Sequence, residues 1–109
     1  MKRIILFFAV FAAVILFQVS CDKEKDTTPP VITMLGDSVI WHPFGEPYVD
    51  PGATALDDTD GDITDKIVTS TNVDVNVQAY NYWVRYNVED AEGNKAEQVQ
   101  RTVNVLILK

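Results

Sequence analysis

Beyond residue 30, apolar residues alternate with polar ones in short runs that turn residues separate. Such period-two runs, rich in β-branched and aromatic residues, predict strands. No sustained 3.6-residue period interrupts them, so the pattern predicts an all-β sandwich of about seven strands. The expected strands are residues 31–35, 39–41, 53–56, 66–69, 72–77, 80–89 and 96–108.

The clearest alternation lies in the strand expected at residues 80–89. Successive side chains of a strand point to opposite faces of its sheet. The face expected to enter the core carries Tyr80, Tyr82, Val84, Tyr86 and Val88. Burying a side chain of this size stabilises a fold by about 1.5–3 kcal/mol. This strand is therefore predicted to contribute a large share of the stability.

The first twenty residues have a different pattern. Lys2 and Arg3 precede an apolar run at residues 4–17, and a charged segment follows at 22–26. Fourteen apolar residues are fewer than the about twenty that a membrane-spanning helix needs, and they fit the core of a signal peptide. An uncleaved membrane anchor is the alternative. The pattern favours a cleavable signal peptide at residues 1–20.

Cys21 stands at the junction between the apolar run and the charged segment. The sequence before it resembles the lipobox of bacterial lipoproteins, although Gln18 stands where a leucine is usual. The resemblance implies that Cys21 carries a lipid anchor. The polar residues after it predict a flexible tether over residues 21–28, and Pro29-Pro30 marks the start of a domain at residues 29–109. We then expect a cell-envelope protein, an outer-membrane lipoprotein exposed at the surface or facing the periplasm. Plain secretion is the alternative.

Charge narrows the possible partners. The chain has a formal charge of −7, and without Lys2 and Arg3 seven basic side chains stand against sixteen acidic ones, a charge of −9. Such a surface repels phosphates, which argues against a nucleic-acid partner. Cys21 is the only cysteine, so no intramolecular disulfide can form. The domain must depend on its apolar core.

Six short motifs occur in order along residues 28–106. They are Thr28-Pro29-Pro30-Val31-Ile32-Thr33, Asp50-Pro51-Gly52-Ala53-Thr54-Ala55, Asp60-Gly61-Asp62-Ile63-Thr64, Tyr82-Trp83-Val84-Arg85-Tyr86-Asn87-Val88, Asp90-Ala91-Glu92-Gly93-Asn94 and Arg101-Thr102-Val103-Asn104-Val105. Together they resemble the Ig-like domain of bacterial surface proteins (the DUF5011 type). The resemblance implies a seven-stranded Greek-key β-sandwich that serves as a spacer or adhesion module, without enzyme chemistry. We therefore expect a non-enzymatic envelope lipoprotein for adhesion, docking or assembly.

The densest acidic cluster suggests a calcium site. Asp58, Asp60 and Asp62 alternate like the first ligands of an EF-hand, because Ca²⁺ prefers several carboxylate oxygens on a tight loop. Asp57 and Asp90 are further candidate ligands. Aspartates that cap the backbone of a turn are the commoner explanation, and it carries more weight because the spacing fails further on. We expect no required cofactor, with a Ca²⁺-stiffened spacer as an alternative.

Two tryptophans are candidates for ligand recognition. Trp83 and Arg85 share the face of their strand that points away from the core, and Trp41 lies on a second strand. An exposed aromatic ring can stack on a sugar or anchor a protein partner. The plainer interpretation of Trp83 is a ring lying against the neighbouring strand. A carbohydrate-binding module is therefore the alternative function.

Overall fold

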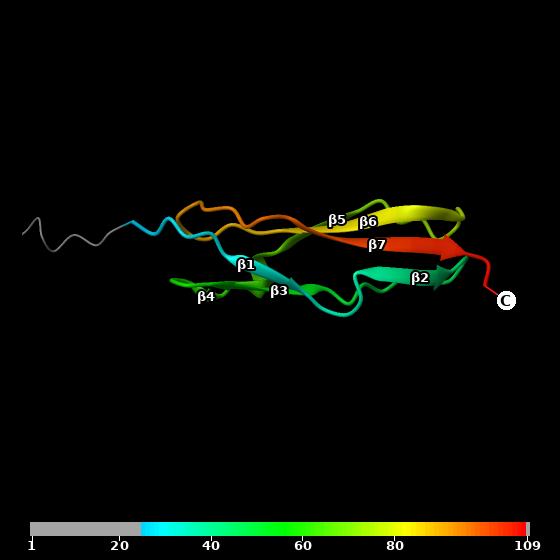
Figure 1. The fold of residues 1–109 in the computed structure, drawn as a ribbon, viewed down its shortest axis with the longest axis horizontal. Coiled ribbons are helices and arrows are strands. Elements are labelled where there is room, and N and C mark those ends of the chain that lie inside the picture. Colours follow the sequence, from blue (N-terminus) through cyan, green and yellow to red (C-terminus); the bar gives the residue numbers. More distant parts are fainter. Residues whose placement is uncertain (1–24, 109) are drawn as a thin grey trace, which may run out of the picture.

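The computed structural model describes residues 25–108 and shows two packed β-sheets (Figure 1). One sheet has three strands in the order β1 (Val31–Met34), β3 (Ala53–Asp57) and β4 (Gly61–Asp62). The other has the order β2 (Val39–Pro43), β7 (Val99–Leu106), β6 (Ala79–Asn87) and β5 (Val68–Thr71). A short 3₁₀ turn, η1 (Thr64–Lys66), precedes β5. The predicted all-β sandwich of seven strands is confirmed.

The first two strands belong to different sheets. β1 pairs antiparallel with β3, whereas β2 pairs parallel with β7. The chain therefore crosses between the layers at residues 35–38 and returns at residues 44–52, before β3. These two crossings close the same end of the three-stranded sheet, because β1 ends where β3 begins. They bring loop carbonyl groups close to the interior.

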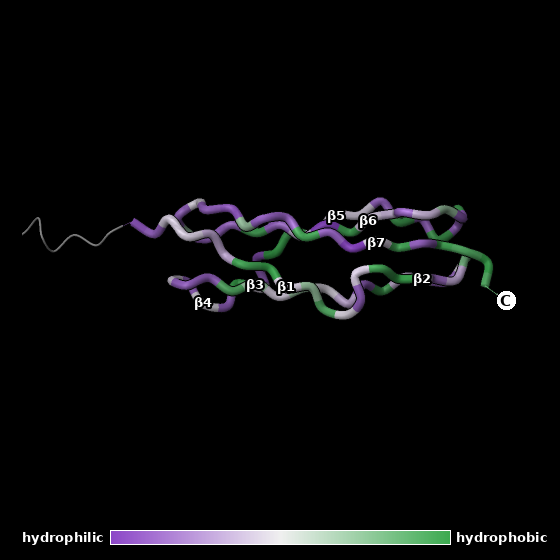
Figure 2. Tube along the Cα trace, in the orientation of Figure 1, coloured by the Kyte–Doolittle hydropathy of each residue, from purple (hydrophilic) through white to green (hydrophobic). Residues whose placement is uncertain are grey.

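The core lies between the sheets, and buried positions alternate with more exposed ones along β3 and the C-terminal half of β6. Figure 2 shows hydrophobic and hydrophilic residues following one another along the chain. Ile32 and Ala55 enter it from the three-stranded sheet. The four-stranded sheet contributes the apolar side chains that are most completely buried: Val84, Tyr86, Val103 and Val105. The predicted core face of the β6 region is thus confirmed at its C-terminal half, where Val84, Tyr86 and Val88 are buried.

The prediction for Tyr80 is wrong, because a bulge interrupts β6. The register with β7 shifts between Ala79 and Tyr82, and Asn81 has a φ of 66°. An inserted residue of this kind moves the side chains on one side of it to the opposite face of the sheet. Tyr80 is therefore 63% exposed, and Tyr82 is only half-buried.

The strand predicted at residues 72–77 is a loop. The Asp74 carboxylate accepts a hydrogen bond from the backbone N–H of Asn76 at 3.0 Å, and the Asp74 carbonyl accepts one from Val77. This local alternative to strand pairing is typical of aspartate. β7 likewise begins only at Val99, although Ala96 is already in the core. Within residues 25–108, no helix has the length and apolarity needed to cross a membrane.

Candidate functional site

The four-stranded sheet buries an arginine that the sequence analysis did not single out. Arg101 of β7 has no exposed surface, and its Nε lies 3.1 Å from Asp50 Oδ1. Asp50 also accepts hydrogen bonds from the Tyr48 hydroxyl at 2.5 Å, from the Tyr86 hydroxyl and from the Gly52 N–H at 2.9 Å. The pair is thus fully hydrogen-bonded, as a buried charge requires.

Arg101 also holds both crossings between the sheets. Its Nη2 donates to the carbonyl oxygens of Leu35 at 2.7 Å and Gly52 at 3.0 Å, and its Nη1 donates to the carbonyl of Asp37. Gly36 lies in sequence between two of these acceptors, Leu35 and Asp37. Its φ of +79° is a backbone conformation that most residues avoid. The guanidinium therefore fixes the backbone of two loops, which is a structural role.

The same contacts shift the proton equilibria. Burial alone would raise the pKa of Asp50, but hydrogen bonds from Tyr48, Tyr86 and Gly52 and the charge of Arg101 lower it overall. Burial and the hydrogen bond to Asp50 raise the pKa of Tyr48 and of Tyr86. The aspartate therefore stays ionised, and both tyrosines stay neutral, over a wide pH range.

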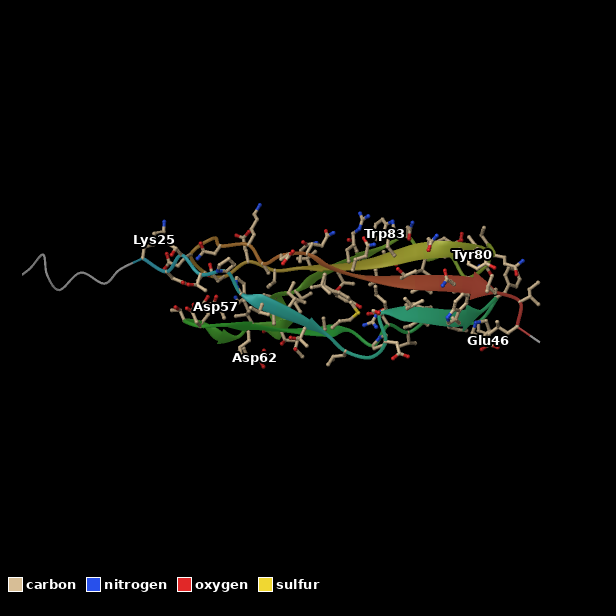
Figure 3. The ribbon with its side chains drawn as sticks, in the orientation of Figure 1. Lys25, Glu46, Asp57, Asp62, Tyr80 and Trp83 are labelled. Atoms are coloured by element: carbon tan, nitrogen blue, oxygen red, sulfur yellow. The ribbon has the colours of Figure 1, made fainter. Side chains whose placement is uncertain are left out.

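The predicted ligand-binding residues lie on the outer face of the four-stranded sheet. Trp41 is opposite Asn104 of β7, and Trp83 is opposite Thr102. Because β7 separates β2 from β6 and the two positions are offset by two residues along β7, the Cα atoms of the tryptophans are roughly 12 Å apart. Figure 3 shows Trp83 on the side of β6 that points away from β3. The structure thus places Trp41 and Trp83 on one face of the sheet.

Tyr80 joins these residues because of the bulge in β6. Its ring lies edge-on to Trp41, with 6.3 Å between the centroids. Asn104 is buried beneath the bulge, and its Oδ1 accepts the Asn81 N–H at 2.7 Å. We call Trp41, Tyr80, Trp83 and Arg85 the aromatic face. The sequence pattern placed Tyr80 in the core, so this member was missed.

The exposure of the two tryptophans differs. Trp41 is 56% exposed, whereas Trp83 is half-buried. The Arg85 guanidinium lies 3.8 Å from the centre of the Trp83 ring, and its Nε donates to Gln100 Oε1 at 2.7 Å. Such a cation–π contact contributes about 0.5–1 kcal/mol at an exposed site. One ring face of Trp83 is therefore covered by its own neighbour.

The predicted metal ligands do not act as one group. Asp60 accepts the Ala91 N–H at 2.8 Å, and Asp62 accepts the Thr64 N–H at 2.9 Å before η1. Asp90 accepts backbone N–H groups in its own loop, from Glu92 and Asn94. These three carboxylates organise turns, as the commoner explanation states. The EF-hand-like arrangement of Asp58, Asp60 and Asp62 does not form.

A different acidic group lies at this end of the sandwich. Oxygens of Asp26, Asp57 and Asp58 lie within 4.8 Å of one another. Asp26 belongs to the segment before β1, and Asn94 Nδ2 donates to its carbonyl at 2.8 Å. The sequence analysis missed Asp26 because it lies about thirty residues before the others. Cys21, the predicted lipidation site, lies outside the described residues.

The Asp26 carboxyl is electrostatically crowded. The Thr28 N–H lowers the pKa of Asp26, but burial, a contact with the Asp90 carboxyl and the charges of Asp58 and Asp57 raise it overall. Burial would raise the pKa of Asp90, yet hydrogen bonds from Asn94 and the contact with Asp26 lower it. The charges of Asp57 and Asp58 therefore disfavour the ionised form of Asp26, whereas its contact with Asp26 favours the ionised form of Asp90.

The two-sheet topology and the shared core define an Ig-like β-sandwich. The family model of the Ig-like domain of bacterial surface proteins matches residues 32–105. The chain therefore belongs to this family of domains of bacterial surface proteins, which fits a location in the cell envelope. A comparison with curated proteins finds no match.

Two solved structures are similar to the chain. One is the lipoprotein BT2262 from Bacteroides thetaiotaomicron, with 29% identity and a TM-score of 0.62 over 73% of this chain and 39% of that chain. The other contains CBM51-2 in complex with GlcNAc and INT domains from Clostridium perfringens ZmpB. It has 28% identity and a TM-score of 0.56 over 72% of this chain and 17% of that chain. The chain thus spans less than two-fifths of each.

Proposed function

We propose that this protein is a non-enzymatic lipoprotein of the outer membrane that docks a protein partner. Its family consists of bacterial surface proteins, and one structural relative is itself a lipoprotein. The sequence around Cys21 supports a lipid anchor at that residue. The buried ion pair of Arg101 and Asp50 is fully used by the fold, which favours binding over catalysis.

The aromatic face is the observation that carries the docking proposal. Its four members come from two strands of one rigid sheet, and Trp41 and Tyr80 are more than half exposed. Tryptophan, tyrosine and arginine are the residues that most often dominate the energy of protein interfaces. A sheet surface holds them in fixed positions, so little conformational entropy is lost on binding.

A protein partner fits this face better than a glycan. A sugar ring stacks on an open aromatic face, whereas Arg85 covers one face of Trp83 and Tyr80 meets Trp41 edge-on. Aromatic edges and a stacked guanidinium suit the side chains and carbonyl groups of a protein. Glycan binding remains the second candidate, supported by the exposure of Trp41 and by the GlcNAc complex named for one relative.

Site-specific photocrosslinking in cells tests the docking proposal. A photoreactive phenylalanine at Trp41 or Tyr80 should give a discrete adduct with one envelope protein. The matched control is Val31, which is 66% exposed but lies on the other sheet. Adducts that are absent at both aromatic positions, or equal at Val31, would contradict the proposal. Glycan-array binding that Trp41→Ala abolishes would favour the second candidate instead.

A further inference from the structure

We propose that Asp26, Asp57 and Asp58 form a Ca²⁺ site that fastens the segment before β1 to the turn between β3 and β4. One oxygen from each carboxylate lies within 4.8 Å of the others. Oxygens that share one Ca²⁺ at 2.3–2.6 Å lie at most about 5 Å apart. The three carboxylates are therefore close enough to bind one ion.

Asp57 is the residue that points to a ligand. It is only 3% exposed, and its Oδ2 accepts the backbone N–H groups of Thr59 at 3.0 Å and Asp60 at 2.9 Å. Its Oδ1 is buried without any hydrogen-bond partner. A buried carboxylate oxygen without a partner is costly, because it has lost its water and gained nothing. A cation at this oxygen removes that cost.

Asp26 repeats the same arrangement from the other side. Its Oδ1 accepts the Thr28 N–H at 3.0 Å, while its Oδ2 is buried without a partner. Both carboxylates thus use one oxygen to shape their own backbone and leave the other free. Asp58 adds a third, exposed carboxylate from the β3–β4 turn.

The group lacks a protein cation. Among residues 25–108, no lysine or arginine nitrogen lies within 4.0 Å of these carboxylates, and the ion pair of Arg101 with Asp50 lies at the crossings between the sheets instead. Carboxylates held together without a positive charge repel one another. The segment before β1 nevertheless lies beside Asp57 at this end of the sandwich (Figure 3). A bound divalent cation would turn this repulsion into attraction.

Calcium fits the group better than magnesium. Ca²⁺ accepts six to eight oxygens in irregular geometry, whereas Mg²⁺ demands a near-ideal octahedron at shorter distances. A hollow of about 300 Å³ lined by residues that include Thr28, Leu56, Asp57 and Asp58 lies beside the group. It gives an ion a path from solvent and leaves space for water ligands.

The site would control the junction between anchor and domain. Asp26 lies five residues after Cys21, and Asp57 is the last residue of the core strand β3. A shared ion would hold the segment from residue 26 against the sandwich. If Cys21 is lipidated as proposed above, Ca²⁺ would set how far the aromatic face can turn relative to the membrane. The ion-binding claim itself does not depend on that anchor.

Calcium titration of the intact chain in detergent tests the site. CaCl₂ should bind with a dissociation constant of about 10⁻⁴–10⁻³ M, the range of extracellular calcium modules. It should also raise the melting temperature relative to the chelator EGTA, because an ion that binds only the folded state stabilises it. MgCl₂ at the same concentration should have a smaller effect.

Three variants locate the ion. Asp26→Asn and Asp57→Asn should each weaken Ca²⁺ binding at least about tenfold, since each removes one carboxylate. Asp62→Asn is the matched control, because Asp62 belongs to the same acidic stretch but accepts the Thr64 N–H. This variant should bind Ca²⁺ as the wild type does. Asp26→Asn decides the matter if Asp57→Asn does not fold, because Asp26 precedes the first strand. Equal melting temperatures in calcium and EGTA, or unchanged binding by Asp26→Asn, would overturn the proposal.

Discussion

Arg101 shows how one buried charge can organise two loops. Its guanidinium reaches the carbonyl groups of Leu35, Asp37 and Gly52, and Asp50 neutralises it. A buried ion pair often adds little net stability over apolar residues, because both charges lose their water. Removing one partner is costly, however, since the other charge stays buried alone. The pair therefore makes the arrangement of the crossings that satisfies both charges far more stable than any arrangement that leaves one of them unpaired.

Replacing the buried arginine is predicted to be severe. Arg101→Met leaves Asp50 and the loop carbonyl groups without partners, so the free energy of unfolding should fall by about 3–5 kcal/mol. Arg85→Met is the control on the outer face of the same sheet, where the loss should stay below about 1 kcal/mol. Urea denaturation of both variants measures the difference. Similar losses in the two variants would show that Arg101 has no special structural role.

The lowered pKa of Asp50 predicts a loss of stability in acid. A carboxylate whose pKa is lower in the folded state stabilises the fold fully above its ordinary pKa, about 3.9 for aspartate. This contribution is lost as the pH falls through the lower folded-state pKa. The free energies of unfolding of wild type and Asp50→Asn, measured by denaturation between pH 6 and pH 2, should therefore begin to converge below about pH 4. A constant difference between them would contradict the assignment.

At the scale of elements, β6 is defined by its bulge. Asn81 adopts a left-handed backbone conformation, and its N–H is satisfied by the buried Asn104 side chain. Asparagine adopts such a conformation more readily than most residues, and β-branched residues hardly adopt it. The bulge turns Tyr80 outward and so completes the aromatic face.

The positive φ in the bulge predicts that two substitutions at Asn81 differ in their effect on stability. Asn81→Gly should leave stability within about 0.5 kcal/mol, whereas Asn81→Val should lower it by about 1–2 kcal/mol because of its positive φ. Asn87→Val, at a regular position of the same strand, is the control and should cost less than Asn81→Val. Thermal denaturation measures all three. If Asn81→Val is as stable as wild type, the bulge is not required by the fold.

The sequence predicts the regular parts of these elements and fails where a single contact overrides the pattern. Alternation in β6 identifies the burial of Val84 and Tyr86, because each side chain there simply follows the pleat. It cannot locate the Asn81 bulge, which depends on Asn104 in another strand. The burial of Arg101 was also missed, because charged residues are expected at the surface. Arg101 nevertheless points to the same face of β7 as Val103 and Val105. That shared parity is the signal for its burial.

At the scale of the whole molecule, the candidate sites lie on different parts of one rigid sandwich. The aromatic face covers the outer side of the four-stranded sheet, and the acidic group lies at the end where residues 25–30 enter (Figure 1). Asp26 was unpredictable from sequence because its partners lie in a distant turn. The family identity, in contrast, follows from motifs spread over nearly the whole domain.

Mass spectrometry of the mature protein from purified envelopes tests whether Cys21 anchors the domain to the membrane. We predict a chain that begins at Cys21 and carries a diacylglycerol thioether there, with an acylated amino group where the bacterium performs that step. Lipoprotein processing at this residue would place the sandwich close to the membrane, since residues 22–28 span at most about 25 Å. A mature chain that begins upstream of Cys21, or one that lacks a lipid there, would rule out the lipid anchor.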